Sequence, residues 1–416
     1  MILLIYLIIV FFLFNFLRPL SAGLLLIFIY TISLACGLII GRDYEVNSLS
    51  EIFNLFFMIC MLTLFILPWN KFNSKITIFE PDSVRMHRLT VCLFAINLLC
   101  FIVFSIVCYY SFTTVSDYSS FRNVQGVSAD FFKTLPINYY LLLLATYLNY
   151  TAFFMLPLHF YYLVKRKYFY SILSLIFSLN IILEGIAIFS RSAMVLYLML
   201  YLLYFIIFYT KIDIKRRSYI LISALIILFF AGDVFARITT NRFDDYTVET
   251  QFFVDNPQLY SVFDYIGQWY QNCNKVMSRY SFTTLNGELS FPFILVIANN
   301  LHLINYEPSM IESTLYAIWG DNFDKFNGII SNLLFDFGYI GTTMFTLLYY
   351  FVLRKLWPVQ GAISFNKLLM LGTLFALPAM GIFNFYMKLA NYNVLIVYSI
   401  IVYIYMSRNT KVYIDR

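Results

Sequence analysis

The sequence predicts an all-α polytopic integral membrane protein with about eleven transmembrane helices and one large periplasmic loop bearing short helices. Three observations point to this class. Hydrophobic residues make up 61% of the 416 residues and charged residues only 12%, with a mean hydropathy of +0.78, whereas soluble domains carry about 25% charged residues. Apolar runs repeatedly reach the length of about 20 residues that a helical span needs. These runs are continuous rather than alternating, which argues against membrane strands.

Each apolar run predicts one helix if it crosses the membrane once. The runs lie at residues 1–17, 20–40, 51–69, 89–110, 137–164, 168–190, 192–210, 218–236, 329–353, 365–383 and 391–407. The first run lacks a basic n-region and a cleavage site of small residues, so we interpret it as a span rather than a removed signal. The run 365–383 contains Pro378 and two glycines, so a kinked or re-entrant helix is an alternative there.

Basic residues cluster in every second connection between these runs. The clusters are Lys71, Lys75, Arg85 and Arg88; Lys165, Arg166 and Lys167; Lys211, Lys215, Arg216 and Arg217; Arg354 and Lys355; and Arg408, Lys411 and Arg416. Cytoplasmic connections are enriched in Lys and Arg, so we expect a cytoplasmic C-terminus and an outer position for residue 1. The net charge of +6 therefore reflects membrane orientation, and no nucleic-acid partner is predicted.

The outer connections are then 41–50, 111–136, 191, 232–327 and 384–390. The longest of them divides the chain into an N-terminal transmembrane bundle (1–231), a large periplasmic loop (232–327), and C-terminal transmembrane helices with a short cytoplasmic tail (328–416). Short turns would connect spans equally well, so a loop of this length is usually functional. We expect it to form a lid over a membrane-embedded site.

Three helical segments are predicted within this loop. Asn256 and Pro257 indicate a helix start, and one apolar face follows at steps of four and three: Leu259, Phe263, Ile266, Tyr270, Cys273 and Met277. Such a face suits packing on the bilayer or on the spans. The apolar run 291–304 is too short to cross and is expected to be interfacial or re-entrant. Ser309 and Glu312 form a capping-box pattern for a helix that ends at Gly320.

The cysteines and histidines predict neither a disulfide framework nor a metal site. Five of the six cysteines fall inside apolar runs, and Cys273 has no obvious partner in the loop. No CxxC pair or His/Cys cluster occurs. No cofactor is predicted.

Charged residues within the bilayer are costly and tend to mark functional sites. Glu184 lies in the run 168–190, and Arg191 follows seven residues later at its outer end. Seven residues are two helical turns, so both side chains are expected on one face. The alternative is that Arg191 is an interfacial anchor with Glu184 as its partner. Asp336, near the start of the run 329–353, is a site residue or else a helix-start cap or packing hydrogen bond.

Arginines are unusual in outer connections, yet Arg122, Arg237 and Arg242 join Arg191 close to span ends. Each alone is compatible with a solvated or headgroup-binding charge. As a set, their planar forks suit the phosphates of a lipid diphosphate and would stabilise charge on a departing diphosphate.

Several acidic residues and one histidine of the loop are further candidates. The carboxylates could act as a general base toward a sugar hydroxyl, although acidic loop residues are more often surface charges. His302 is the sole histidine on the predicted outer side. These candidates are Asp244, Asp245, Glu288 and His302.

The layout resembles the Wzy-type O-antigen polymerases (oligosaccharide repeat-unit polymerases) and, more distantly, the O-antigen ligases. Two stretches carry the local match. Phe189-Ser190-Arg191-Ser192-Ala193 resembles the Ser-Arg pair that these families place at the periplasmic end of a span. Asn327 through Asp336-Phe337-Gly338-Tyr339-Ile340-Gly341 resembles the segment that enters the span after the large loop. The ligases usually have a histidine where this chain has Asn327, and this difference favours a polymerase.

The resemblance implies a glycosyltransferase of the bacterial inner membrane that needs no metal or nucleotide sugar. Its substrates would be undecaprenyl-diphosphate-linked oligosaccharides, handled among membrane lipid together with a chain-length regulator protein. We assign Arg191, Arg237, Arg242 and Glu184 to catalysis, and Arg122, Asp244, Asp245, His302, Asn327 and Asp336 to substrate binding. A flippase or transporter for the same lipid-linked oligosaccharide, and a ligase-like glycosyltransferase, are the alternatives. The length of 232–327 and the absence of an internal repeat argue against a transporter.

Overall fold

The computed structural model describes residues 2–17, 19–41, 48–118, 121, 127–218, 220, 222, 232, 237, 257–280, 283–306, 308–320, 326–383 and 385–407. The chain forms two compact units. The first comprises residues 1–73, 247–360 and 374–394, and the second comprises 74–246, 361–373 and 395–416.

The fold is that of an all-α membrane protein. Seven helical segments in the described part are long and apolar enough to cross a bilayer: Ala22–Ile39, Leu49–Lys71, Ser83–Thr114, Tyr139–Val164, Tyr168–Ala187, Ser192–Lys211 and Ala390–Ser407. Helices occupy ten of the eleven predicted runs, and the remaining run, 218–236, lies largely outside the described residues. The long apolar runs thus dictate where helices form, because a lipid environment requires every backbone group to be bonded within its own segment.

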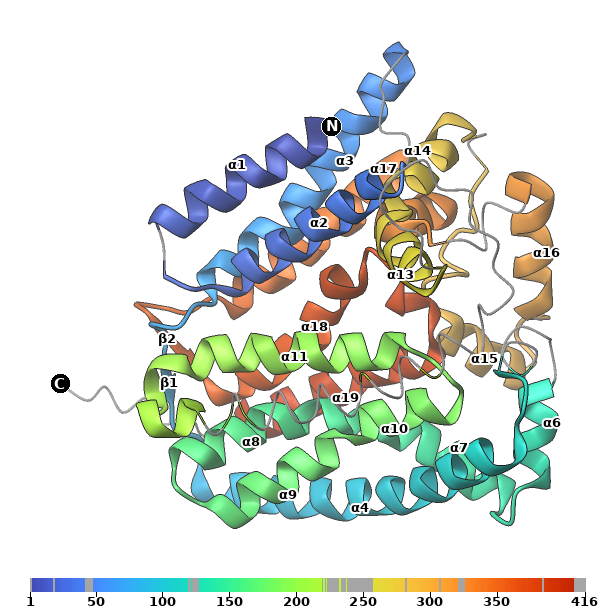
Figure 1. Cartoon of the computed structure of the whole chain (residues 1–416). Coiled ribbons are helices and arrows are strands. Elements are labelled where there is room, and N and C mark those ends of the chain that lie inside the picture. Colours follow the sequence, from blue (N-terminus) through green and yellow to red (C-terminus); the bar gives the residue numbers. More distant parts are fainter. Residues whose placement is uncertain are drawn as a thin grey trace. The chain divides into compact units, whose positions relative to one another are not determined.

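Four long helices lie side by side in the first unit (Figure 1): α1 (Ile2–Leu17), α2 (Ala22–Ile39), α3 (Leu49–Ile66) and α17 (Gly328–Leu356). Polar caps fix two of their starts. Ser21 accepts a hydrogen bond from the backbone N–H of Leu24, and Ser48 forms a capping box with Glu51. The short helix η1 (Leu67–Lys71) after α3 places Trp69 in the core, where its indole N–H donates to the Tyr349 hydroxyl across 2.9 Å.

The segment predicted to be one amphipathic helix forms two, α13 (Pro257–Gly267) and α14 (Trp269–Ser278), with a break at Gln268. Helix α13 packs on α2 so closely that a Cβ on Gly267 would lie 2.3 Å from the backbone nitrogen of Gly37. The Ser33 hydroxyl donates to the Ile266 carbonyl across 2.6 Å and accepts a bond from the Trp269 indole across 2.7 Å. This part of the large loop is therefore fixed to the span bundle.

The next two loop helices, α15 (Pro292–Asn300) and α16 (Pro308–Trp319), also lie in the first unit. Helix α15 buries none of its residues, and Ile294 and Ile297 are exposed. An apolar face of this kind fits an interfacial position in a membrane. Helix α16 ends at the expected glycine, Gly320, which has a φ of +62°, a conformation that favours glycine over other residues.

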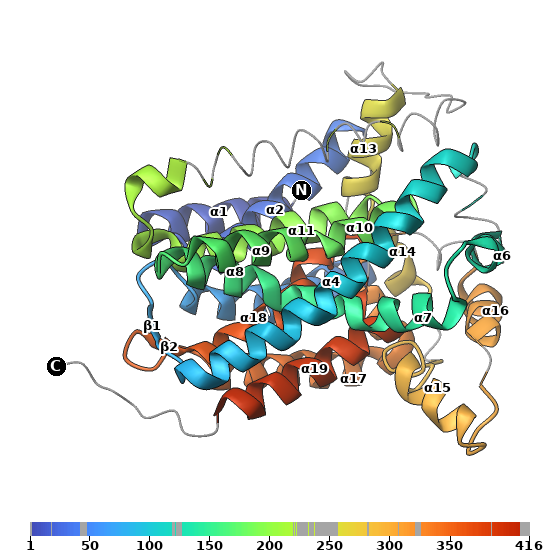
Figure 2. The same ribbon diagram turned by 90° about the horizontal axis from the view of Figure 1, so that it is seen from below.

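The second unit contains α4 (Ser83–Thr114), α6 (Val127–Thr134), α7 (Tyr139–Leu148), η2 (Asn149–Phe154), α8 (Met155–Val164), α9 (Tyr168–Ser178), α10 (Asn180–Ala187), α11 (Ser192–Phe208) and η3 (Tyr209–Lys211). Helix α8 packs against both α9 and α11, and α4 packs against α7 and α10 (Figures 1 and 2). At 1.5 Å per residue, α4 is about 48 Å long and reaches both ends of this unit.

Two helices are shared between the units, α18 (Phe365–Met380) and α19 (Ala390–Ser407). The short helix η5 (Tyr386–Lys388) precedes α19 and belongs to the first unit.

Basic connections of the second unit meet at one end of it. Lys165 pairs with Glu80, the Thr210 hydroxyl donates to the Ser74 carbonyl across 2.5 Å, and Arg216 donates to the Leu163 carbonyl across 3.4 Å. The same end holds the strands β1 (Thr77–Phe79) and β2 (Ala362–Ser364), which pair in parallel. These six residues lie in connections outside the predicted apolar runs, so the short strands leave the all-α class unchanged.

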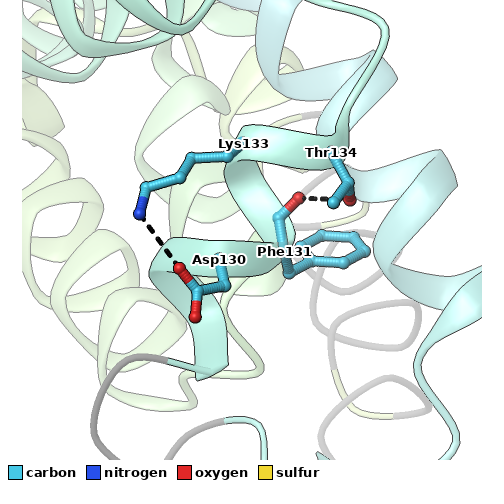
Figure 3. A network of polar contacts seen from close by, with 4 residues as sticks. All are labelled: Asp130, Phe131, Lys133 and Thr134. Atoms are coloured by element: carbon cyan, nitrogen blue, oxygen red, sulfur yellow. Dashed lines mark hydrogen bonds and ion pairs between the residues drawn. The ribbon is translucent and has the colours of Figure 1, made fainter.

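The far end of the second unit carries α6, where Lys133 and Asp130 form an ion pair at 3.0 Å and the Thr134 hydroxyl donates to the Phe131 carbonyl across 2.8 Å (Figure 3). The ion pair raises the pKa of Lys133. Both charged side chains are largely exposed, so solvent screens the interaction and it adds little stability.

Candidate functional site

Helix α10 ends in a tight reversal that leads directly into α11. The backbone N–H of Ser190 donates to the Gly185 carbonyl across 2.8 Å, and that of Phe189 donates to the Ile186 carbonyl across 2.9 Å. These two bonds form a Schellman motif, in which the residue after the helix adopts a left-handed conformation. That residue is usually glycine, but here it is Phe189, with a φ of +50°.

An aromatic cluster holds Phe189 in this strained conformation. Its ring is fully buried and stacks on Tyr118 with centroids 3.9 Å apart and an angle of 9°. Phe112 and Phe121 meet the same ring edge-on at 5.4 and 5.5 Å. A residue held in this region costs about 1–3 kcal/mol, which burial of a whole phenyl ring can offset. The turn is therefore fixed by packing, and such over-determined strain clusters at functional sites.

Gly185 and Ala193 set the distance between α10 and α11. A Cβ on Gly185 would lie 2.3 Å from the Cβ of Ala193 and 3.2 Å from the Ser190 carbonyl oxygen. Only glycine permits this approach. The turn between them holds the Ser190 and Ser192 hydroxyls 2.9 Å apart, on either side of Arg191.

Arg191 occupies the N-cap position of α11, and only 2% of it is exposed. No side chain caps this helix start, so the positive end of the helix dipole lies at the residue that carries the guanidinium. The backbone N–H groups of a helix start and an arginine fork both bind anions. The arrangement therefore favours a negatively charged group at this position.

The expectation that Glu184 and Arg191 share one helical face is wrong. Helix α10 ends at Ala187 and the left-handed Phe189 reverses the chain, so the phase of a continuous helix does not apply. Both residues nevertheless belong to the same hairpin, Glu184 on α10 and Arg191 at the start of α11.

Glu184 belongs to a buried polar network within the second unit. The Asn149 amide donates to the Glu184 carboxylate across 2.8 Å and to the Asn180 carbonyl across 3.1 Å. The Asn180 amide in turn donates to the Asn97 carbonyl across 2.9 Å, and the Asn97 amide donates to the Thr151 hydroxyl across 3.0 Å. Side-chain oxygens of Asn149 and Asn180 are buried without a hydrogen-bond partner.

The helices break where this network lies. A 3₁₀ segment, η2, separates α7 from α8 beginning at Asn149, and Leu179 separates α9 from α10 next to Asn180. A 3₁₀ stretch in the middle of a helix often marks a functional hinge, and broken helices line substrate sites in membrane proteins. The two helix breaks thus lie beside polar side chains from three candidate spans.

Glu184 is predicted from the sequence as a site residue, but the three asparagines of its network are not. A usable signal existed, since Asn97, Asn149 and Asn180 each interrupt an apolar run, and polar side chains within membrane spans are enriched at helix contacts and sites. The sequence spacing of these three asparagines does not predict that they contact one another, because they belong to three different runs.

Asp336 lies in the first unit, where its carboxylate binds backbone N–H groups. Its fully buried carboxylate accepts hydrogen bonds from the backbone N–H groups of Gly287 at 3.1 Å, Leu289 at 3.0 Å and Ser290 at 2.7 Å. The carboxylate thus fixes the turn that joins α14 to α15, which matches the alternative of a packing hydrogen bond.

The neighbouring motif residues bend α17. Gly338, inside the helix, has a φ of +65°, and a Cβ there would lie 2.5 Å from the Tyr280 hydroxyl oxygen. Asn327 is buried at the N-cap position of α17. His302 is exposed after α15, with a φ of +57°. The first unit therefore contains Asp336, Asn327 and His302, whereas Glu184 and Arg191 belong to the second.

The remaining predicted site residues are Arg122, Arg237, Arg242, Asp244 and Asp245. Arg122, Arg242, Asp244 and Asp245 lie outside the described residues. Arg237 is helical and exposed. In the part of the chain that the structure describes, no three His, Cys, Asp or Glu side chains gather as metal ligands, and all six cysteines are free thiols.

No match to a family model, to a curated protein or to a solved structure was found. The hairpin of α10 and α11 and the asparagine network are therefore interpreted from their own chemistry.

Proposed function

We propose that the protein polymerises undecaprenyl-diphosphate-linked oligosaccharide repeat units at the periplasmic face of a bacterial inner membrane. The observation that supports this best is the burial of Arg191 at the uncapped start of α11, in the turn of the same hairpin as Glu184. A guanidinium at the positive end of a helix favours the binding of an anion. A lipid diphosphate supplies one.

In the proposed reaction, a hydroxyl of the new lipid-linked unit attacks the anomeric carbon of the growing glycan. The new glycosidic bond forms as the bond between the glycan and its carrier diphosphate breaks, and the hydroxyl proton passes to a base or to solvent. Negative charge develops on the departing diphosphate, where Arg191 stabilises it. Glu184 balances the guanidinium charge when no donor is bound.

The layout of the second unit supports an outer position for this turn. The turn contacts the C-terminal end of α4, where the Ser111 hydroxyl donates to the Ala187 carbonyl across 3.0 Å. The opposite end of α4 carries Arg85 and lies with the basic connections. Basic connections favour the cytoplasm, so the aromatic turn with Arg191 belongs on the other side in this proposal.

The experiment is complementation of a deletion strain, read as the length distribution of surface polysaccharide on gels. Arg191→Ala should leave single repeat units on the core lipid while the protein accumulates normally in the membrane. Arg191→Lys should restore chains in part, because an ammonium lacks the planar fork. Arg88→Ala, an exposed cation of the basic end, is the matched control and should polymerise normally. Normal chain length in Arg191→Ala would overturn the proposal.

A flippase or transporter for the same lipid is the second candidate, and the broken helices with their asparagine network favour it. The deletion strain separates the two. Loss of a polymerase leaves single units on the core lipid, whereas loss of a flippase or of a ligase leaves none.

A further inference from the structure

A cavity of about 860 Å³ opens at the basic end of the second unit. Its volume falls within the range of about 300–1,000 Å³ typical of small-molecule pockets. It lies among α8, α9, α11 and the segment after η3, and its lining includes His159, Leu163, Ile172, Tyr201, Arg216 and Arg217.

The cavity has an apolar wall and a cationic rim. Leu163 and Ile172 contribute to the wall. Three cations, Lys215, Arg216 and Arg217, also line the cavity, together with one carboxylate, Asp213. Backbone carbonyls hold both arginines in place. The Arg217 Nε donates to the Ile212 carbonyl across 2.9 Å, and Arg216 bonds the Leu163 carbonyl and pairs with Asp213 at 3.2 Å. The rim therefore presents ordered positive charge beside a hydrocarbon-like surface.

His159 adds a buried polar group to this cavity. It is 6% exposed, and its Nδ1 lies 2.9 Å from the Ser171 carbonyl oxygen. A carbonyl only accepts, so Nδ1 carries the proton and the neutral ring presents an acceptor at Nε2. That Nε2 is buried without a hydrogen-bond partner. An unsatisfied buried acceptor beside a cavity calls for a donor from an occupant.

We propose that this cavity binds an anionic phospholipid whose headgroup carries a hydroxyl. The phosphate lies at Arg216 and Arg217, an acyl chain follows the wall along Ile172, and the hydroxyl donates to His159 Nε2. Charge complementarity selects the anionic headgroup, and the apolar wall selects a lipid over free phosphate. The site does not depend on the proposed polymerase reaction, since it uses none of the same residues.

The test is native mass spectrometry of the full chain in neutral detergent, titrated with four probes. Phosphatidylglycerol should bind about tenfold tighter than phosphatidylcholine, because its headgroup has a net negative charge and a hydroxyl donor, whereas the choline ammonium cancels the phosphate charge and offers no donor. Phosphatidylethanol, which keeps the charge but lacks the hydroxyl, should fall between them. Inorganic phosphate at equal concentration should not displace phosphatidylglycerol. Equal affinity for phosphatidylglycerol and phosphatidylcholine, or displacement by phosphate, would overturn the proposal.

Variants assign the contacts. Arg217→Gln should weaken phosphatidylglycerol binding about tenfold and phosphatidylcholine binding less, whereas Arg354→Gln, an exposed cation of the first unit, should change neither. If Arg217→Gln does not fold, Arg217→Lys keeps the charge and should show a smaller loss. His159→Phe should remove the preference for phosphatidylglycerol over phosphatidylethanol, and His159→Gln, which keeps an acceptor, should retain it. An equal loss of phosphatidylglycerol affinity in Arg354→Gln and Arg217→Gln would indicate unspecific annular lipid and contradict the proposal.

Discussion

The side-chain amide of Asn149 joins the Glu184 carboxylate, at 2.8 Å, to the backbone of Asn180, at 3.1 Å. One amide thus serves a charged group and a carbonyl beside the break between α9 and α10. Asn149 therefore links the carboxylate to the helix break. A carboxylate within the bilayer is costly unless it has hydrogen-bond partners.

This arrangement predicts a strong energetic coupling between the two side chains. Asn149→Ala removes a hydrogen bond to a charged group and should lower the free energy of unfolding by about 1.5–3 kcal/mol. Once Glu184 is also alanine, the same Asn149→Ala change should cost much less, because no carboxylate is left without its donor. Thermal unfolding of the four proteins in detergent gives the coupling as a double-mutant cycle.

Thr146→Ala is the control for that cycle, since the Thr146 hydroxyl bonds the Leu142 carbonyl of its own helix. It should change stability little, with or without Glu184. Additive effects of Asn149→Ala and Glu184→Ala would contradict the coupling.

The contact of Gly185 with Ala193 makes a second prediction. Gly185→Ala places two rigid methyl groups 2.3 Å apart, so α10 and α11 must separate and the turn with Arg191 must move. Overpacking of this kind costs about 1–3 kcal/mol, and we expect loss of long polysaccharide chains. The second change Ala193→Gly removes the opposing methyl group and should restore chain length in the Gly185→Ala protein. Normal chains in Gly185→Ala alone would show that the hairpin distance has no functional role.

Most helix positions could be predicted from the sequence because run length in a membrane chain directly determines helix length. The run predicted at 329–353 corresponds to α17 (Gly328–Leu356), and the one at 192–210 to α11 with η3. The break at Gln268 could not be predicted, since the apolar period continues through it and the close contact of Gly267 with Gly37 joins residues far apart in the sequence.

Of the candidate site, only the charged residues could be predicted from the sequence. Intramembrane charge draws attention to Glu184 and Arg191, but their spatial relation depends on a left-handed phenylalanine at position 189. Sequence rules assign that conformation to glycine or asparagine. The aromatic partners that stabilise it, Tyr118 and Phe121, are about 70 residues away, a distance that no local pattern spans.

The carboxylate of Asp336 makes a third prediction, about stability rather than catalysis. Asp336→Ala leaves the three N–H groups of Gly287, Leu289 and Ser290 without their acceptor. Unsatisfied buried donors cost about 1–3 kcal/mol each, partly relieved by movement of the turn, so we expect a total loss of about 3–5 kcal/mol. Thermal unfolding measures it, and Asp130→Asn, which alters an exposed carboxylate, should leave unfolding unchanged. An unchanged midpoint for Asp336→Ala would contradict the role.

Asp82 predicts a pH dependence of stability at the start of α4. Its carboxylate accepts hydrogen bonds from the backbone N–H groups of Arg85 and Val84 at 3.0 and 2.9 Å, and these bonds lower the pKa of Asp82. A pKa lower in the folded than in the unfolded state stabilises the protein above the unfolded value, about 3.9, and the gain disappears as pH falls through the folded value. Asp82→Asn keeps a capping oxygen without titrating. The difference in unfolding midpoint between wild type and Asp82→Asn should be constant above about pH 5 and shrink below it, and a difference independent of pH would refute this linkage.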